Sequence, residues 1–250
     1  MALKGTKGPD RVLYAVSALL QSKLPSMIAR YNAREPAEAL LVLPNDSLVL
    51  AEATALTFTI DSVAQSISFA AGTYTSADVI TTINNAETAL SASAFGSGII
   101  LSAAKSIKFT SAFCSLRAGQ IVNYQPLIMP TSFIISGVLP AETDIKAYPS
   151  VVVELQSIQP ADDTIMVTYS VGLTIGLTSP INSSQADFLS KQLLKYYDVI
   201  RDILTIEDDG SLGGVTNGCN IISAQIDEAT GASNFLKYLT ITLDVYLEED

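Results

Sequence analysis

The stretch VIRDILTIEDDGSLGGVTNGCNI, residues 199–221, decides how the second half of this chain folds. It joins the end of an amphipathic helix to a β-strand through a glycine-rich loop. The loop follows a helix, and its glycines suit a helix exit that needs positive φ. We therefore expect positive φ at Gly210, Gly213 or Gly214.

The helix before this loop lies within NSSQADFLSKQLLKYYDVIRDILTI, residues 182–206. Ser184 and Asp187 have the three-residue spacing of a capping box. Apolar residues then recur at the three- and four-residue spacing of one helical face. The predicted apolar stripe consists of Phe188, Leu189, Leu193, Tyr196, Tyr197, Ile200, Ile203 and Leu204.

Strand patterns surround this helix. TIMVTYSVGLTIGLTS (164–179) alternates, which predicts one buried face bearing Ile165, Val167, Tyr169, Val171, Leu173 and Ile175. SVVVELQSI (150–158), CNIISAQID (219–227) and FLKYLTITLDVYLEE (235–249) also have the patterns of strands. The last two are predicted to close the sheet.

The first part of the chain predicts another helix, from Asp10 to Tyr31, with Pro25 as a place where it could kink or end. ALLVL (39–43) suits a short strand, and residues 116–147 suit one strand and a long loop. Together these elements predict an α+β fold, a mostly antiparallel sheet covered by two helices on one face.

Residues 47–115 differ in composition from the rest of the chain, because they are rich in Thr, Ser and Ala and contain few charged residues. LTFTI (56–60) alternates, the segment DSVAQ (61–65) suits a hairpin connection, and Thr75 with Asp78 forms a second capping box. We interpret the block as a ββαββ unit. The predicted domains are a core of residues 1–46 and 116–250, and an inserted surface domain of residues 47–115.

Composition excludes several kinds of site. The 250 residues include no His, no Trp and two Cys. Without His, a Ser-His-Asp triad, a Cys-His pair and a histidine-ligated zinc site cannot form. The net charge of −11 argues against gripping nucleic acid, because phosphate binding needs a positive surface.

The motifs that remain do not point to catalysis. EDDGSLGG lacks the alternating ligands and closing Glu of a calcium loop, and it lacks the Lys and Ser/Thr of a phosphate loop. Asp162 and Asp163 lie in a predicted turn, where Asp is favoured. We predict no catalytic, cofactor-binding or metal-binding residue and no enzyme activity. A carboxylate-based hydrolase stays open as an alternative.

The N-terminal segment and the cysteines indicate the cellular compartment in which the chain is made. The N-terminal segment is amphipathic, and no window approaches the roughly 20 apolar residues of a membrane helix. We expect a soluble chain made inside the cell, without a membrane partner. Cys114 and Cys219 are isolated in the sequence and are predicted to be reduced, partly buried thiols, with a disulfide as the alternative.

Charge is unevenly distributed along the chain. Residues 1–34 carry a net charge of +5, and residues 198–250 a net charge of −9. This asymmetry suggests contacts between copies, although solvated surface is the simpler interpretation of each single charge. The candidate contacts between subunits or rings are Lys4, Lys7, Arg11, Glu207, Asp208, Asp209, Glu248 and Glu249.

The α+β part of the sequence outside residues 47–115 resembles the tail terminator proteins of long-tailed bacteriophages, and more broadly the neck proteins between head and tail. The resemblance covers residues 9–46 and 148–250. Its most specific part is the helix followed by the SLGG loop and a strand. It rests on the segments DRVLYAVSALLQSKLP, YPSVVVEL, VIRDILTIEDDGSLGGVTNGCNI and LTITLDVYLEED.

Residues 47–115 depart from that family pattern. They look like the small modules inserted into phage tail and flagellar hook-associated proteins, where such modules lie on the outer surface. An adhesin or fibre-attachment protein that acts through this block is therefore the alternative function.

The resemblance implies a structural virion protein at the head–tail junction, assembled in the host cytoplasm. It implies a ring, commonly of six copies, that stacks on the tail tube, stops tube growth and docks the head connector. The implied partners are further copies of the chain, the tail tube protein and the connector or neck proteins. Genomic DNA would pass through the lumen without specific binding, because acidic groups repel it.

Overall fold

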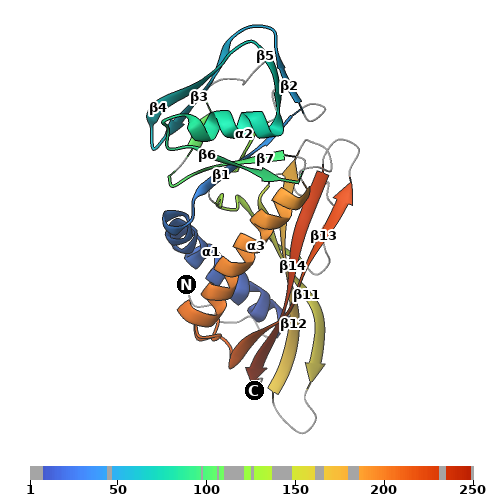
Figure 1. Cartoon of the computed structure of the whole chain (residues 1–250). Coiled ribbons are helices and arrows are strands. Elements are labelled where there is room, and N and C mark those ends of the chain that lie inside the picture. Colours follow the sequence, from blue (N-terminus) through green and yellow to red (C-terminus); the bar gives the residue numbers. More distant parts are fainter. Residues whose placement is uncertain are drawn as a thin grey trace. The chain divides into compact units, whose positions relative to one another are not determined.

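The structure is a computed structural model of the whole chain (Figure 1). Within the residues that it describes there are three α-helices, one π-helical turn and fourteen strands. The chain divides into two compact units: unit 1 is assigned residues 1–29, 129–179 and 189–250, and unit 2 residues 30–128 and 180–188. The described residues are 8–43, 47–96, 98–105, 107–109, 121–124, 127–136, 148–160, 166–179, 186–230 and 235–248.

Unit 1 is built on a five-stranded sheet with the order β10-β11-β12-β14-β13. All neighbouring pairs are antiparallel except β10 and β11, which are parallel. β12 and β14 pair over their full length, from Met166 opposite Glu248 to Ser179 opposite Phe235. The strands are β10 (Ser132–Ser136), β11 (Ser150–Pro160), β12 (Met166–Ser179), β13 (Gly218–Thr230) and β14 (Phe235–Glu248).

The core of unit 1 lies on the alternating face of the two central strands. Val171 lies opposite Leu243 and Leu173 opposite Ile241, and all four side chains are fully buried. Tyr169 is buried on the same face, as the alternation predicts, and Ile165 lies outside the described residues. The prediction of a buried face is therefore confirmed for Tyr169, Val171, Leu173 and Ile175, whereas Val167 is half-buried and Gly172, Thr174 and Gly176 are buried on the other face as well.

Two helices lie on one side of this sheet in Figure 1: α1 (Pro9–Arg34) and α3 (Ala186–Asp202). α1 contains Pro25 but continues beyond it, so the proline does not end the helix. α3 carries the predicted apolar stripe as far as Ile200, and Ile203 and Leu204 lie beyond its end; of the whole stripe only Tyr197 is half-exposed. Ser184, the predicted cap of α3, lies outside the described residues.

By length and composition α1 is long and apolar enough to cross a membrane, contrary to the expectation from sequence. However, 56% of its most apolar window is buried inside the fold. The core helix of a soluble protein can be equally long and equally apolar. Its buried residues are Val12, Leu13, Ala15, Val16, Ser17, Leu19, Leu20, Leu24, Met27 and Ile28.

Unit 2 contains three small sheets, with the orders β6-β7-β1-β9, β4-β3-β8 and β2-β5. β1 pairs with β7 and with β9, antiparallel in both cases. The strands are β1 (Ala37–Val42), β2 (Ser47–Leu50), β3 (Thr54–Ile60), β4 (Val63–Phe69), β5 (Gly72–Thr75), β6 (Ser91–Phe95), β7 (Gly98–Ala103), β8 (Ile107–Phe109) and β9 (Ile121–Tyr124).

The helix of unit 2, α2 (Ser76–Asn85), begins at the predicted capping box. Thr75 Oγ1 accepts from the Asp78 amide, and the Asp78 carboxylate accepts from the Thr75 amide at 2.9 Å. Asn84 joins the helix to β6 by two hydrogen bonds with Ala92. Val79 and Ile83 are fully buried in a core that also contains Leu56, Phe58, Phe69 and Leu101.

This unit departs from the predicted ββαββ order. In the described part of residues 47–115, four strands precede the helix and three follow it. The β3–β4 connection is a two-residue turn at Asp61 and Ser62, both with positive φ, so residues 63–65 of the predicted connection belong to a strand. The compact unit also begins earlier than expected, at Arg30, because β1 pairs with β7.

Candidate functional site

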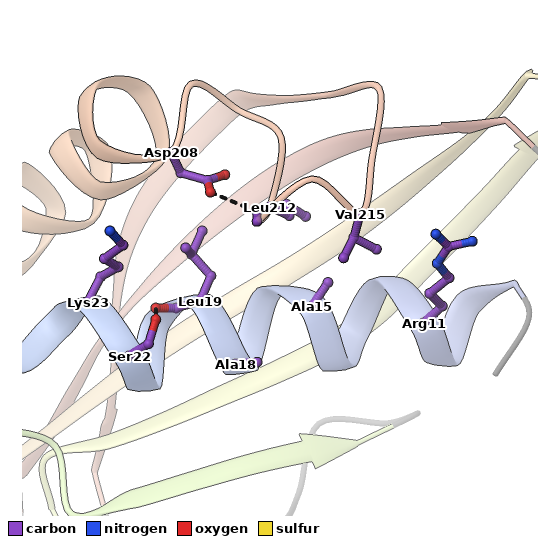
Figure 2. Close-up of a pocket in the computed structure, with 10 residues that line it drawn as sticks. Arg11, Ala15, Ala18, Leu19, Ser22, Lys23, Asp208, Leu212 and Val215 are labelled. Atoms are coloured by element: carbon purple, nitrogen blue, oxygen red, sulfur yellow. Dashed lines mark hydrogen bonds between the residues drawn. The ribbon is translucent and has the colours of Figure 1, made fainter. Parts of the chain in front are cut away.

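Unit 1 has a hollow of about 710 Å³ along the first half of α1. We call it the α1 hollow. One wall is the exposed edge of α1, and the other is the loop that leaves α3 (Figure 2). The hollow is lined by Arg11, Ala15, Ala18, Leu19, Ser22, Lys23, Asp208, Leu212, Gly213 and Val215.

The helical wall follows from spacing on α1. Arg11, Ala15, Ala18 and Ser22 recur every three or four residues, so they share one face of the helix. The alanines between the polar ends let the loop approach the helix closely. Ser22 is not a free hydroxyl, because its Oγ donates a 2.8 Å hydrogen bond to the Leu19 carbonyl.

The loop wall begins with a change in helix type. After Asp202 the chain continues as a π-helical turn, η4 (Ile203–Glu207), where the sequence predicted α-helix. π-turns inside or at the end of helices are often found at functional sites. The Gly210 amide then donates to the Leu204 carbonyl at 2.9 Å, which closes the helix end.

Positive φ occurs at all three predicted glycines, Gly210, Gly213 and Gly214. It also occurs at Asp209 and Leu212, which the sequence did not predict. A non-glycine residue in this region costs about 1–3 kcal/mol. Leu212 is only 2% exposed, so burial of its side chain offsets that cost.

Side chains within the loop hold its shape. The Gly213 amide donates to Asp208 Oδ1 at 2.7 Å, and the Gly214 amide donates to Ser211 Oγ at 3.1 Å. Ser211 Oγ in turn donates to the Asp208 carbonyl. The hydroxyl of Ser211 and one oxygen of Asp208 are therefore engaged in structure.

The loop is also tied to the end of the sheet. The Asn217 amide donates to the Tyr246 carbonyl at 2.8 Å, and Asn217 Oδ1 accepts from the Glu248 amide at 3.1 Å. The loop is thus anchored at both ends, on α3 and on β14. We conclude that its wall of the α1 hollow is preformed.

The electrostatics of the α1 hollow are uneven. Asp208 Oδ2 is buried and has no hydrogen-bond partner among the described residues. Figure 2 shows Arg11 and Lys23 toward opposite ends of the helical wall. They are twelve positions apart, which is about 18 Å along a helix. Neither cationic head group has an ion-pair partner in the described part of the chain.

The candidate contacts from sequence are placed differently by the structure. Arg11 and Asp208 line the same hollow within one copy, while Glu207 and Asp209 are exposed on the turn beside it. Glu248 is exposed at the end of β14. Lys4, Lys7 and Glu249 lie outside the described residues.

Sequence reasoning did not select Lys23, Leu212 or Val215 for this site. For Lys23 a signal existed, because it directly follows Ser22, which continues the α1 face of Arg11, Ala15 and Ala18. For Leu212 and Val215 there was none, because their approach to α1 depends on the path of the loop.

Cys219 lies just beyond the loop, is buried and forms no disulfide. Burial, together with the nearby charges of Asp208 and Asp244, raises the pKa of its thiol to about 12. The thiol is therefore protonated and unreactive at neutral pH. This confirms the prediction for Cys219, while Cys114 lies outside the described residues.

The described residues contain no group of three Cys, Asp or Glu side chains that could hold a metal ion. The α1 hollow offers an apolar floor, two cationic side chains and one buried carboxylate oxygen. This combination suits the binding of a partner more than catalysis. No protein-family model matches this chain, and no curated protein matches it.

Proposed function

We propose that this protein is a structural virion subunit that forms a ring at the head-proximal end of a phage tail. The ring ends polymerisation of the tail tube and docks the tail to the head connector. The proposal builds on the resemblance of the frame to tail terminator proteins. The α1 hollow is the observation that carries it, because a preformed apolar hollow with cations at its ends suits an acidic segment of a neighbouring protein.

The mechanism is complementarity between surfaces in a closed ring. Arg11 and Lys23 attract acidic groups of the neighbour, and Leu19, Leu212 and Val215 supply apolar contact. Asp208 Oδ2 accepts a donor from the neighbour, which satisfies an oxygen that is buried without a partner in the single copy. The acidic surface elsewhere repels DNA and lets it pass.

The test is mass measurement and electron microscopy of the purified protein, alone and mixed with tail tubes. We expect rings that cap the tubes. Arg11→Glu with Lys23→Glu should abolish capping. Arg30→Glu with Arg34→Glu, on the same helix and with the same change of charge, is the matched control and should cap normally. A protein that stays monomeric even with tail tubes would overturn the proposal.

A second candidate function is decoration or host attachment through residues 47–115, which we propose form a surface module together with the strands that pair with them. Unit 2 has its own core and leaves Val49 and Val63 67% and 61% exposed. Removing only residues 47–115 would leave β1 without β7, so the sharper experiment replaces residues 37–128 with a Gly-Ser linker. Tails of normal length that join heads would favour decoration; overlong tails or unjoined heads would favour the junction.

A further inference from the structure

The dimensions of the α1 hollow limit what can bind in it. Arg11 and Lys23 line it toward opposite ends, twelve positions apart on α1, which is about 18 Å. A volume of about 710 Å³ over that length leaves a cross-section of about 40 Å². An α-helix with its side chains is about 10 Å wide, or about 80 Å², whereas a strand in packed sheets occupies about 5 by 10 Å. The hollow therefore fits an extended segment better than a helix.

The charges of the α1 hollow specify where an occupant is acidic. Arg11 and Lys23 have no ion-pair partner in the described part of the chain, although the net charge of the protein is −11. Asp208 adds a negative charge on the loop wall, so acidic groups are favoured only beside the two cations. In an extended chain 18 Å corresponds to about five residue spacings. The complementary segment is therefore acidic at both ends and uncharged between them.

Between the two cations a second backbone can come close to the walls. Ala15 and Ala18 line the hollow on α1, and Gly213 lines it on the loop. A Cβ added at Gly213 would meet nothing within 4 Å, so the space beside its backbone is open. The Gly213 carbonyl accepts no hydrogen bond from the described residues. An extended segment can offer backbone N–H groups to it, whereas the interior N–H groups of a helix bind the helix's own carbonyls.

The chain's own acidic segments are already used in its fold. Acidic pairs five or six positions apart occur in residues 46–52, 202–208 and 244–250. The first range contains β2, which pairs with β5, and the last contains the end of β14, which pairs with β12 and β13. The middle range contains the π-helical turn η4. The complementary segment is therefore expected on a different protein.

We propose that the α1 hollow binds an extended segment of another protein, about six residues long, with an acidic residue at each end and uncharged residues between them. The segment lies along α1, with its ends beside Arg11 and Lys23 and its backbone beside Gly213. This inference rests on the proposed function, in which the partner is a protein of the tail tube or the connector. It adds the chemistry by which that partner is recognised.

The first test uses a synthetic six-residue peptide with Glu at both ends and alternating Val and Thr between them. We expect the full-length protein to bind it at low salt, measured by the anisotropy of a fluorescent label on the peptide, and added salt to weaken binding by screening the charges. The control peptide has the same composition with both Glu residues at one end. It cannot reach both cations, so it should bind about threefold more weakly.

Two results with peptides would overturn the proposal. Equal affinity for the two peptides would show that the spacing of the acidic groups is not recognised. Tighter binding of an alanine-rich helical peptide, with two Glu residues eleven positions apart on one face, would place a helix in the hollow.

Two glycine variants test where the peptide lies. Gly213 and Gly214 have φ of 73° and 79°, and an added Cβ meets nothing within 4 Å at either position. Of the two, Gly213 lines the hollow and Gly214 does not. Gly213→Ala should weaken peptide binding about tenfold, because its methyl group stands in the path of the segment. Gly214→Ala has the same backbone strain and should bind as the wild type does. Equal affinity of the two variants would overturn the proposal.

Charge variants give a measurement that does not depend on the loop. Arg11→Gln and Lys23→Gln should each weaken peptide binding about threefold at low salt. Arg34→Gln, on the same helix but outside the hollow, should leave it unchanged. An affinity that changes in neither hollow variant would contradict the recognition of the acidic ends.

The outcome for this site is separable from the outcome for the proposed function. Peptide binding by a protein that stays monomeric with tail tubes would overturn the function and leave the segment site standing. Rings that cap tubes but do not bind the peptide would overturn the segment site and leave the function standing. Rings of the purified protein that dissociate when the peptide is added would place a second copy in the hollow, and would also overturn the proposal of a different protein.

Discussion

The Gly213 amide donates a 2.7 Å hydrogen bond to Oδ1 of Asp208, five residues earlier in the chain. This bond closes the loop that forms one wall of the α1 hollow. The positive φ of Gly213, 73°, belongs to the turn that brings its amide back toward the carboxylate. The second oxygen, Oδ2, is buried without a partner among the described residues. One carboxylate thus both shapes the loop and leaves an acceptor for a neighbour.

Removing the Asp208 carboxylate, whose Oδ1 accepts the hydrogen bond from the Gly213 amide, should destabilise unit 1. We expect Asp208→Ala to lower the free energy of unfolding by about 1–2 kcal/mol, because the Gly213 amide loses its partner. Asp208→Asn keeps an acceptor oxygen and removes the buried unpaired charge, so its loss should be smaller. Urea denaturation followed by tyrosine fluorescence measures both, since the chain has no Trp. Equal losses in the two variants would contradict a stabilising role for the bond.

Gly210 and Gly213 should respond differently to the same substitution. Both have positive φ, so alanine strains the backbone by about 1 kcal/mol at either position. At Gly210 an added Cβ would also lie 3.1 Å from the Cys219 carbonyl oxygen, whereas at Gly213 it meets nothing within 4 Å. Gly210→Ala should therefore unfold at a clearly lower denaturant concentration than Gly213→Ala. The reverse order would show that the contact with Cys219 is relieved at little cost.

The buried thiol of Cys219 should make stability depend on pH in the alkaline range. Its pKa is raised from 9.0 to about 12 in the folded protein, so the folded state keeps a proton that the unfolded state releases. The resulting stability is fully present below pH 9 and is lost as the pH rises toward 12. The stability of Cys219→Ala should fall less steeply over this window, as measured by denaturation at several pH values.

A labelling experiment checks the same environment. A thiol reagent at pH 8 should leave Cys219 unmodified in the native protein and modify it in urea. Rapid modification of the native thiol would show that Cys219 is accessible and would contradict its burial.

The capping box of α2 should stabilise unit 2. Thr75→Ala removes the side-chain acceptor of the Asp78 amide and should cost about 1 kcal/mol. Thr81→Ala, an exposed change inside the same helix, is the control and should be neutral or slightly stabilising. The stability of helix α2 in the two variants can be compared by the protection of its amides against hydrogen exchange.

The same box predicts a response to acid. Hydrogen bonds from the side chain and the backbone of Thr75 lower the pKa of Asp78 below its model-peptide value of 3.8. The contribution of Asp78 is therefore present above pH 3.8 and is lost as the pH falls through the lower, folded-state pKa. Protection of the α2 amides should decrease in that range, and Asp78→Asn should remove the decrease.

The elements with a strong local period could be predicted from sequence. The apolar stripes of α1 and α3 follow the helical period and the residues of β12 alternate, so the type and position of these elements follow from residue spacing alone. Positive φ at Gly210, Gly213 and Gly214 follows because only glycine adopts it without strain. The capping box of Thr75 and Asp78 is likewise a local interaction between residues three positions apart.

Pairing over long sequence distances could not be predicted in this way. Strands β2, β5 and β6 are four or five residues long, and their patterns are too short to distinguish from loops. β1 joins β7, some sixty residues later, because burial of both strands in unit 2 favours the pair. The burial of Leu212 offsets the cost of its positive φ, and no local pattern records that burial.

The sequence by itself determined which segments are helices and long strands, where the glycine loop turns, and which chemistries cannot occur without His. Only the tertiary structure decided that Arg11, Lys23 and Asp208 share one hollow, and that β12 and β14 are central strands of the sheet while β10 and β13 are the outermost strands among the described residues. The physical reason is that periodicity reports the burial of each segment separately. Which segments meet is set by the free energy of packing all of them at once.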